Sequence, residues 1–330
     1  MFGWGITMKY KHMIQVASAS LFLSSLVVPL TVSSGAGKCL YVSSYHRGYA
    51  WSDGVEQGLR RVLTGHCEIR QIDMDTKRNK SVEFKQSAAS EVKHEIETWR
   101  PDVVIVSDDN AAKYVVKQYY RDADTPFVFS GVNWTVKEYG FPYSNVTGII
   151  EVAPLKAMLT NAIKYSGGAK KAIYLGADTL TEKKNLDRVA GVSQKLGIEL
   201  EGNLVSNSSE WKAQYRAAQD VDFIVMGSYS GISDWNEDEM AMFAVEHATK
   251  LTVTSHDWMM PFSTIGFTKI PQEHGEWAAQ TAIEILKGKS PSEIPIVANR
   301  DWDLWLNMAH LESTRITLPR KILRKAKKIN

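Results

Sequence analysis

The segment Pro101-Asp-Val-Val-Ile-Val-Ser-Asp-Asp-Asn110 carries the pattern from which the fold is best inferred. Residues 103–106 are continuously apolar and β-branched, which is typical of a strand buried on both faces of a parallel sheet. The strand ends at polar residues 107–110, and a helix is expected over 111–120. A buried strand that leads directly into a helix is the repeating unit of an α/β fold.

The same alternation extends in both directions along the chain. Upstream we expect strands at 39–43 and 67–72, a helix between them with Ser52 or Asp53 as N-cap, and a helix over 82–98. Downstream, a strand at 126–129 completes this series, and a second series follows with strands at 145–150, 171–175, 200–205, 222–226 and 251–254 and helices at 154–165, 184–196 and 209–219. We therefore predict an α/β fold of two successive open units of similar size, each with a doubly wound parallel sheet.

Length and composition agree with two domains and exclude several function classes. The chain has 330 residues and is 44% hydrophobic, which is too apolar for a disordered protein. Its 39 Lys and Arg nearly balance 37 Asp and Glu, whereas a nucleic-acid binder would need a basic surplus. Ten Trp and 13 Tyr are numerous, and they serve either core packing or stacking on a ligand.

The first 36 residues have the layout of a secretory signal peptide. Lys9 and Lys11 precede an apolar run over 14–32, and small residues follow at 33–36. The alternative is an uncleaved membrane anchor, because the run is about 20 residues long. We expect cleavage and a periplasmic location. Loss of the two Lys leaves a mature chain with almost no net charge.

Export would place the two cysteines in an oxidising compartment. Cys39 and Cys67 each open a predicted strand, so adjacent parallel strands would bring both to one edge of the sheet. A disulfide is therefore expected, and two unpaired thiols are the alternative. Two cysteines this far apart, without a paired histidine motif, do not indicate a metal site.

Candidate binding residues are those beyond the carboxyl ends of the predicted strands, where open α/β sheets bind ligands. They combine hydroxyls, carboxylates and aromatic rings: Ser44, Tyr45, His46, Tyr49, Trp51, Asp108, Asp109, Ser130, Asn133, Trp134, Glu151, Asp178, Tyr229, Asp257 and Trp258.

Several of these residues also have a structural interpretation. One of Asp108 and Asp109 is expected to be a helix N-cap, and the other would meet a ligand amine. The rings of Trp51, Trp134 and Trp258 either line the cleft or pack the lobes. His46 near Asp108 allows an acid–base role, but a polar surface role is the simpler interpretation.

Catalytic and cofactor motifs are missing from the sequence. It contains no Gly-x-Ser-x-Gly elbow, no phosphate-binding Gly-rich loop with Lys and no His-Glu-x-x-His. No Gly-x-Gly-x-x-Gly follows the first strand, which argues against a dinucleotide. We therefore predict no catalytic residue, cofactor or metal. An exported enzyme using His46 with Asp108 or Asp109 is a remote alternative.

Several segments in order resemble exported substrate-binding proteins of the uncharacterised ABC-transporter type. They are Val42-Ser-Ser-Tyr-His-Arg-Gly-Tyr-Ala-Trp51, 101–110, Ser130-Gly-Val-Asn133, Asn145-Val-Thr-Gly148, Gly275-Glu-Trp-Ala-Ala279, 285–295 and 307–323. The resemblance implies a type I periplasmic binding protein, with two Rossmann-like lobes, a hinge crossed more than once and a ligand between the lobes. It also implies a membrane partner, and we expect the protein itself to be a monomer.

The expected hinge crossings predict which residues belong to each lobe. The first crossing is expected at 148–154, the second near 262–269 and the third near 296–300. The N-terminal lobe would then hold 37–149 plus about 268–297, and the C-terminal lobe 150–267 plus about 298–330. Glu151 would lie at the base of the cleft, where it would meet either a ligand ammonium or a hinge cation.

The resulting functional hypothesis is a solute receptor for an ABC importer. Its ligand would be a small organic molecule with an amine, such as an amino acid, held by Asp109 or Glu151. Trp51 or Trp134 would stack on the ligand. The alternative is an exported sensor that presents its ligand to a membrane histidine kinase or cyclase.

Overall fold

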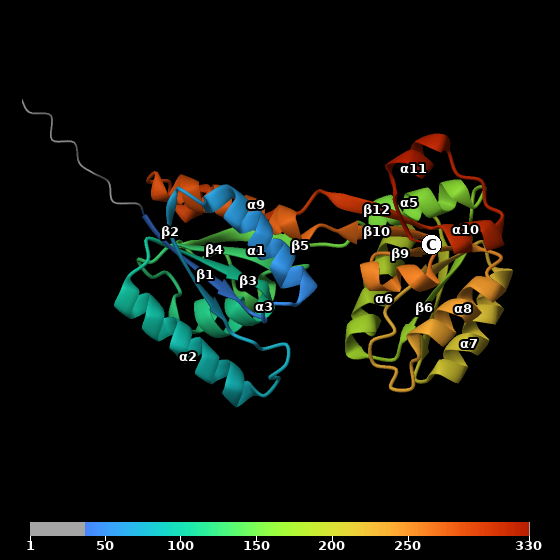
Figure 1. The fold of residues 1–330 in the computed structure, drawn as a ribbon, viewed down its shortest axis with the longest axis horizontal. Helices are drawn as coiled ribbons and strands as arrows, with labels where there is room; N and C mark the ends of the chain where they lie inside the picture. The colour runs from blue at the N-terminus through green and yellow to red at the C-terminus, as the bar shows by residue number, and fades with distance from the viewer. Residues whose placement is uncertain (1–36, 330) are drawn as a thin grey trace, which may run out of the picture. The chain divides into compact units, whose positions relative to one another are not determined.

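The computed structural model describes residues 37–329, which form two β-sheets flanked by helices (Figure 1). The first sheet is parallel throughout, in the order β11-β5-β4-β3-β1-β2. Its strands are β1 (Gly37–Ser43), β2 (Cys67–Asp73), β3 (Val103–Ser107), β4 (Phe127–Asn133), β5 (Val146–Glu151) and β11 (Val297–Ala298). The predicted signal peptide, residues 1–36, lies outside the described residues.

Helices cover both faces of this sheet because alternate strand residues point to opposite sides. Leu40 and Val104 pack in one core with α2 (Val82–Trp99) and with the helical segment 108–119. Cys39 and Val103 pack in the other with α1 (Ala50–Leu63) and α9 (Pro271–Leu286). The segment 108–119 consists of α3 (Asp108–Ala111), a π-helical turn (Ala112–Val116) and α4 (Lys117–Tyr119).

The first helix begins earlier than predicted. Its N-cap residue is Tyr49, without a side-chain cap, rather than Ser52 or Asp53. The carboxylate of Asp53 accepts the N–H of Gly48 at 2.9 and 3.1 Å. The capping-type side chain therefore stabilises the loop before the helix, which explains why the N-cap rule misplaced the start.

The second sheet has the order β13-β12-β10-β9-β8-β6-β7 and contains one antiparallel pair, β10 with β12. Its strands are β6 (Lys171–Ala177), β7 (Glu199–Val205), β8 (Phe223–Met226), β9 (Leu251–Thr254), β10 (Ile265–Lys269), β12 (Trp302–Asn307) and β13 (Lys327–Ile329). Its helices are α5 (Leu155–Tyr165), α6 (Leu180–Lys195), α7 (Ser208–Ala217), α8 (Glu237–His247), α10 (Met308–Thr314) and α11 (Arg320–Lys325). Short 3₁₀ turns occur at Lys137–Tyr139, Ala218–Asp220, Asp257–Phe262 and Pro291–Glu293.

The chain passes between the two sheets three times. It leaves the first sheet after β5, returns between β10 and α9, and leaves again between β11 and β12. The predicted two-lobed α/β fold with several crossings is confirmed. The second crossing follows Lys269 instead of spanning 262–269, because 265–269 forms strand β10. No helix within residues 37–329 has the length and apolar character needed to cross a membrane.

A disulfide joins Cys39 in β1 to Cys67 in β2, as predicted. The two strands are parallel neighbours, with Gly37 opposite Cys67, so Cys39 lies two residues farther along. The Cα atoms of the two cysteines are 6.0 Å apart, which is within the normal range for a bridge.

Helices α1 and α9 lie side by side although they are far apart in the sequence (Figure 1). They meet at glycines. A Cβ atom on Gly275 would lie 2.6 Å from the backbone nitrogen of Leu59 and closer still to the carbonyl oxygen of Val55. A Cβ on Gly58 would likewise clash with the carbonyl of Gln272. Glycine is needed here because two backbones are in contact.

We therefore expect Gly275→Ala to lower the free energy of unfolding by about 1–3 kcal/mol, the usual cost of overpacking. The matched control is Gly191→Ala in α6, where an added Cβ would meet nothing within 4 Å. Because alanine is the better helix former, that variant should gain up to about 1 kcal/mol. Urea unfolding of both variants measures the difference, and equal effects would contradict close packing of α1 on α9.

Candidate ligand-binding site

Asp108, the first residue of α3, is the centre of the candidate site. Only 2% of its surface is exposed, and its backbone φ is +68°. Trp51 Nε1 donates a 3.0 Å hydrogen bond to Oδ1. Burial raises the pKa of this carboxyl well above its usual range, and the nearby charges of Glu151 and Asp109 raise it further. An ionised Asp108 therefore needs a cation.

Three buried polar atoms around Gly131 have no hydrogen-bond partner within residues 37–329. They are Asp108 Oδ2, Ser130 Oγ and His274 Nε2. Gly131 adopts a φ of +67°, and a Cβ there would lie 3.1 Å from Asp108 Oδ1, so glycine lets the backbone approach the carboxylate. The Gly131 N–H donates to His274 Nδ1 at 3.3 Å, which leaves Nε2 as the ring's free donor. Unpaired buried groups of this kind call for an explanation, and a bound ligand is one.

Lys269, at the end of β10, connects this strand to β5 of the first sheet through an ion pair. Its ammonium forms an ion pair with Glu151 at the end of β5 and lies 5.4 Å from the centre of the Trp51 ring. Of the two interpretations of Glu151, the structure shows the hinge ion pair. Burial lowers the pKa of His256 and of His274 to about 3 in each case, and Lys269 adds to this. Both imidazoles are therefore neutral at pH 7, and Lys269 is the cation of this group.

The loop before α1 forms an aromatic cluster that also holds a cation. The rings of Tyr45 and Tyr49 meet edge to face with their centres 5.4 Å apart. Lys77 lies 5.0 and 4.8 Å from the two ring centres. Burial raises the pKa of Tyr45, followed by the charges of Asp108 and Asp109, which links this cluster electrostatically to the carboxylates.

His46 is placed with a different carboxylate from the one suggested by the sequence. Its Nδ1 lies 3.4 Å from Asp75, and Asp75 in turn forms a two-pronged pair with Arg78 at 2.7 and 2.8 Å. The structure therefore places the ring of His46 beside the carboxylate of Asp75 in a loop, instead of in the acid–base pairing with Asp108.

Neither Asp108 nor Asp109 is an N-cap, which corrects the prediction. The N-cap position is Ser107, without a side-chain cap, and the Oγ of Ser44 accepts the N–H of Ala111 at 2.8 Å instead. Ser44 therefore holds the start of this helix from the neighbouring strand.

The carboxylate of Asp109 is already satisfied by protein groups. It accepts the Nδ2–H of Asn133 at 2.7 Å and the hydroxyl of Tyr139 at 2.6 Å. The burial of Tyr139 and the charge of Asp109 raise the pKa of that hydroxyl. Asp109 and Asn133 therefore make a fixed network at the tips of β3 and β4, which makes Asp109 a poorer anchor for an amine than Asp108.

Trp134 follows β4 and has a cation on its ring. Its backbone φ is +60°, and its N–H donates to the carbonyl of Glu151 at 2.9 Å. The guanidinium of Arg188 in α6 lies 4.4 Å from the ring centre. Burial lowers the pKa of Arg188.

The predicted residues of the second lobe mostly have protein partners. Asp178 pairs with exposed Lys183 at 2.6 Å. Tyr229 stacks on Trp235 with the ring centres 4.6 Å apart, in the core beneath. Trp258 is 44% exposed, and its ring stacks on His256. Its Nε1–H donates to the Oγ of Ser228 at 3.2 Å. The carboxylate of Asp257 accepts the backbone N–H of Trp258. Of the two predicted aromatic residues, Trp258 is the more exposed.

Sequence reasoning missed Lys269, Lys77, His256 and His274. Lys269 lies at the end of a strand, so the strand-tip rule could have selected it. It was not selected because 265–269 was interpreted as part of a crossing between the lobes. His274 lies in the first turn of α9, and no local pattern connects it to Gly131. Within residues 37–329, no group of three or more His, Cys, Asp or Glu is arranged to hold a metal.

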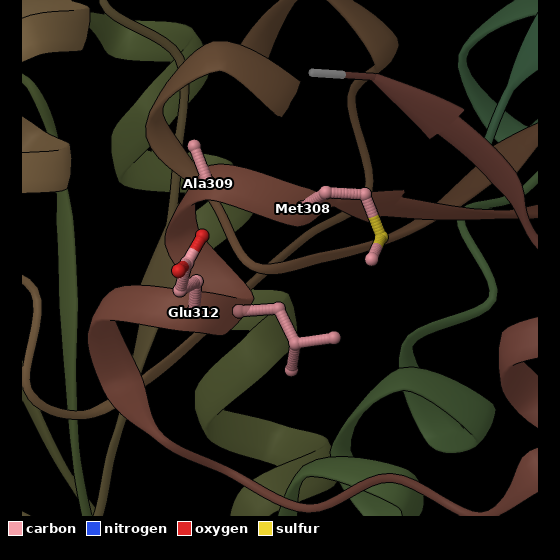
Figure 2. Close-up of a pocket in the computed structure, with 4 residues that line it drawn as sticks. Met308, Ala309 and Glu312 are labelled. Atoms are coloured by element: carbon pink, nitrogen blue, oxygen red, sulfur yellow. The ribbon is translucent and has the colours of Figure 1, made fainter.

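Two shallow surface pockets lie away from these residues. One of about 420 Å³ is lined by Met308, Ala309, Leu311 and Glu312 on α10 (Figure 2). The other, of about 270 Å³, is lined by Lys113, Tyr114, Lys117 and Gln118. Neither contains a predicted site residue, so the candidate site is defined by its contacts instead.

Two parallel-sheet lobes joined by three crossings, with polar and aromatic side chains at the strand tips, define the class of two-lobed type I periplasmic binding proteins. The sequence matches the family of ABC transporter substrate binding proteins over residues 45–330. The chain belongs to this family. No curated protein is similar enough in sequence to match it.

Solved structures with this fold are distant in sequence. The ligand-free, open structure of a substrate binding protein with adhesive properties from Clostridium difficile is 15% identical, with a TM-score of 0.72 over 89% of this chain and 99% of that one. An ABC domain from Streptococcus pneumonia in complex with L-Trp is also 15% identical, with a TM-score of 0.58 over 89% and 100%. A periplasmic ribose ABC transporter from Conexibacter woesei is 12% identical, with a TM-score of 0.56 over 86% and 95%. At these identities the likeness establishes the fold.

Proposed function

We propose that this protein is exported and captures a small organic ligand with an amine, which it delivers to an ABC importer. Export rests on the predicted signal peptide, and the Cys39–Cys67 disulfide is consistent with an oxidising compartment. We propose Asp108 as the partner of the ligand ammonium, and Trp51 and Trp134 as the rings that contact it.

The observation that carries the proposal is that the candidate rings already have protein cations on their faces. Lys269 lies over Trp51, Arg188 over Trp134, and Lys77 over Tyr45 and Tyr49. Ring faces are negative and attract cations. A surface whose rings attract Lys and Arg of the protein itself would also attract a ligand amine.

The local charge favours the same ligand class. The charges of Glu151 and Asp109 raise the pKa of Asp108, and the charges of all three carboxylates raise the pKa of Tyr45. Lys269 is already paired with Glu151. An incoming ammonium would relieve the repulsion among the carboxylates and pair with the free oxygen of Asp108. A phosphate or sulfate would add to the negative charge.

Capture requires side chains to move, because Asp108 Oδ2 is buried. Ligand contacts that are made only after such a movement shift the equilibrium between conformations. Binding would therefore be coupled to rearrangement at the hinge, where Glu151 and Lys269 are paired. The importer would then recognise the liganded conformation.

Thermal unfolding against a panel of metabolites tests the proposal. Amines, and aromatic amino acids among them, should raise the Tm by about 5 °C or more at 100 times Kd, because binding to the folded state adds about 2.7 kcal/mol. Each active amine is compared with its deaminated analogue, which keeps the ring and the carboxylate but loses the cation. If only anions or neutral sugars stabilise the protein, the proposed ligand class is wrong.

A further inference from the structure

The C-terminal segment concentrates positive charge in an otherwise acidic chain. Residues 315–330 contain seven Lys and Arg and no Asp or Glu. Of the 39 Lys and Arg in the whole sequence, Lys9 and Lys11 precede residue 37, whereas all 37 Asp and Glu follow it. Residues 37–330 are therefore neutral overall, and the seven basic residues balance seven excess acids in residues 37–314.

Helix α11 turns much of this charge to one side. Arg320, Lys321, Arg324 and Lys325 are exposed, and their spacing of one and four residues places them on one face of the helix. We call these four residues the C-terminal basic face. The opposite face holds Ile322 and Leu323, which are partly buried against the core of the second lobe. The helix is therefore anchored with its cations outward.

The four residues have no structural partner that explains them. None has an acidic side chain within 4.0 Å among residues 37–329. By contrast, Lys327 pairs with Asp303 and lies over Trp305, and β13 is an edge strand, where Lys residues prevent unwanted pairing. Lys327 and Lys328 thus have a structural role, and the basic face does not.

We propose that the C-terminal basic face binds the surface of anionic phospholipid membranes. The face is purely cationic, and no large exposed apolar side chain occurs in residues 315–329. Protein interfaces are usually centred on apolar or aromatic anchors and are poor in Lys, whereas a layer of lipid phosphates needs only exposed cations. The buried Ile322 and Leu323 make this a surface association without insertion.

Such binding would keep the protein close to a membrane with the second lobe toward it. Each basic residue near an anionic surface strengthens association about fivefold at low ionic strength. Four together should therefore raise membrane binding by about 100-fold or more, and salt should weaken it because the charges are exposed. The association would be reversible under physiological conditions.

Sedimentation with vesicles tests the proposal on the purified full-length protein. The parent should bind vesicles of phosphatidylglycerol and phosphatidylcholine, and binding should fall at about 0.5 M salt, where the Debye length is below about 5 Å. Arg320→Gln, Lys321→Gln, Arg324→Gln and Lys325→Gln together should weaken this binding about 100-fold. Ile322 and Leu323 are unchanged in this variant, and an unaltered Tm would verify its fold.

The matched control removes four exposed cations elsewhere that form no ion pair within residues 37–329: Lys113→Gln, Lys184→Gln, Lys195→Gln and Lys287→Gln. It has the same net charge as the first variant and the same residues 1–36, so it should retain nearly all vesicle binding. Equal loss in both variants would reduce the effect to net charge and overturn the proposal. If the parent does not bind vesicles at all, the proposal is also wrong. If the parent binds immobilised polyglutamate but not vesicles, the basic face would instead bind an acidic protein partner.

Discussion

Asp108→Asn should make the ligand-free protein more stable and strongly weaken its binding of amines. The carboxylate is buried, repelled by two other carboxylates and has one oxygen without a partner. Asparagine keeps an oxygen to accept the Trp51 hydrogen bond and tolerates a φ of +68°. Removing the buried charge should raise the free energy of unfolding by about 1–3 kcal/mol at pH 7. Losing the ion pair with the ligand should weaken binding about 30-fold or more.

The stability difference should depend on pH with a defined sign. The pKa of Asp108 is higher in the folded protein than in the unfolded chain, so the folded state holds its proton to higher pH. Below about pH 4 both states are protonated, and the parent has no charge penalty. As the pH rises toward the folded-state pKa, the parent loses stability and the variant does not. The advantage of the variant should therefore grow with pH and then stay constant.

Asp109→Asn is the matched control, because it removes a neighbouring carboxylate whose two oxygens both accept hydrogen bonds, whereas Asp108 has one oxygen without a partner among the described residues. Asp109 accepts hydrogen bonds from Asn133 and Tyr139, so its loss should lower stability by about 1–2 kcal/mol. Urea unfolding and calorimetry with an active amine measure both effects. If Asp108→Asn lowers stability and leaves affinity unchanged, Asp108 is a structural residue and the proposed anchor is wrong.

Replacing Cys39 and Cys67 together by alanine should lower the free energy of unfolding by about 3–4 kcal/mol. The bridge closes a loop with a sequence separation of 28, and loss of such a constraint increases the entropy of the unfolded chain by about this amount. Both cysteines are buried in the same core, so alanine introduces no unpaired polar group. Tm should fall by about 10 °C, and the first lobe should be affected more than the second.

Two comparisons isolate the effect of the bridge itself. The parent under reducing conditions should unfold at nearly the same temperature as the double variant, and reductant should not change the variant further. Each single alanine variant should come close to the double variant, because either one removes the bridge. A double variant as stable as the oxidised parent would show that the bridge contributes nothing to stability.

Most of the fold is predictable because it depends on local patterns. The run Val103–Val106 is apolar on both faces, and the structure buries each of these residues. Strand β9 has the predicted bounds, 251–254, and α2 differs from the prediction by one residue. By contrast, β10 and β12 are separated in the sequence by α9 and by β11 of the first sheet. No local sequence pattern therefore predicts that these two strands pair.

The candidate site is less predictable, because its residues meet only through tertiary contacts. The strand-tip rule selects Trp51 and Asp108, which do lie in contact. It does not reveal that the Asp109 carboxylate is fully engaged by Asn133 and Tyr139, or that Glu151 pairs with Lys269. These outcomes decide which carboxylate is left for a ligand, and they depend on side chains 24 to 118 residues away.

The sequence by itself determined the two-lobed α/β architecture, and it favoured the pairing of Cys39 with Cys67 that the structure shows. Apolar runs, turns and strand order act over short distances along the chain, so they can be interpreted without the structure. Only the tertiary structure decided which charges are isolated and which are paired. Burial and electrostatic energy depend on distances in space, and here those distances leave Asp108 as a buried carboxylate with one oxygen unpartnered within residues 37–329, close to rings that protein cations cover.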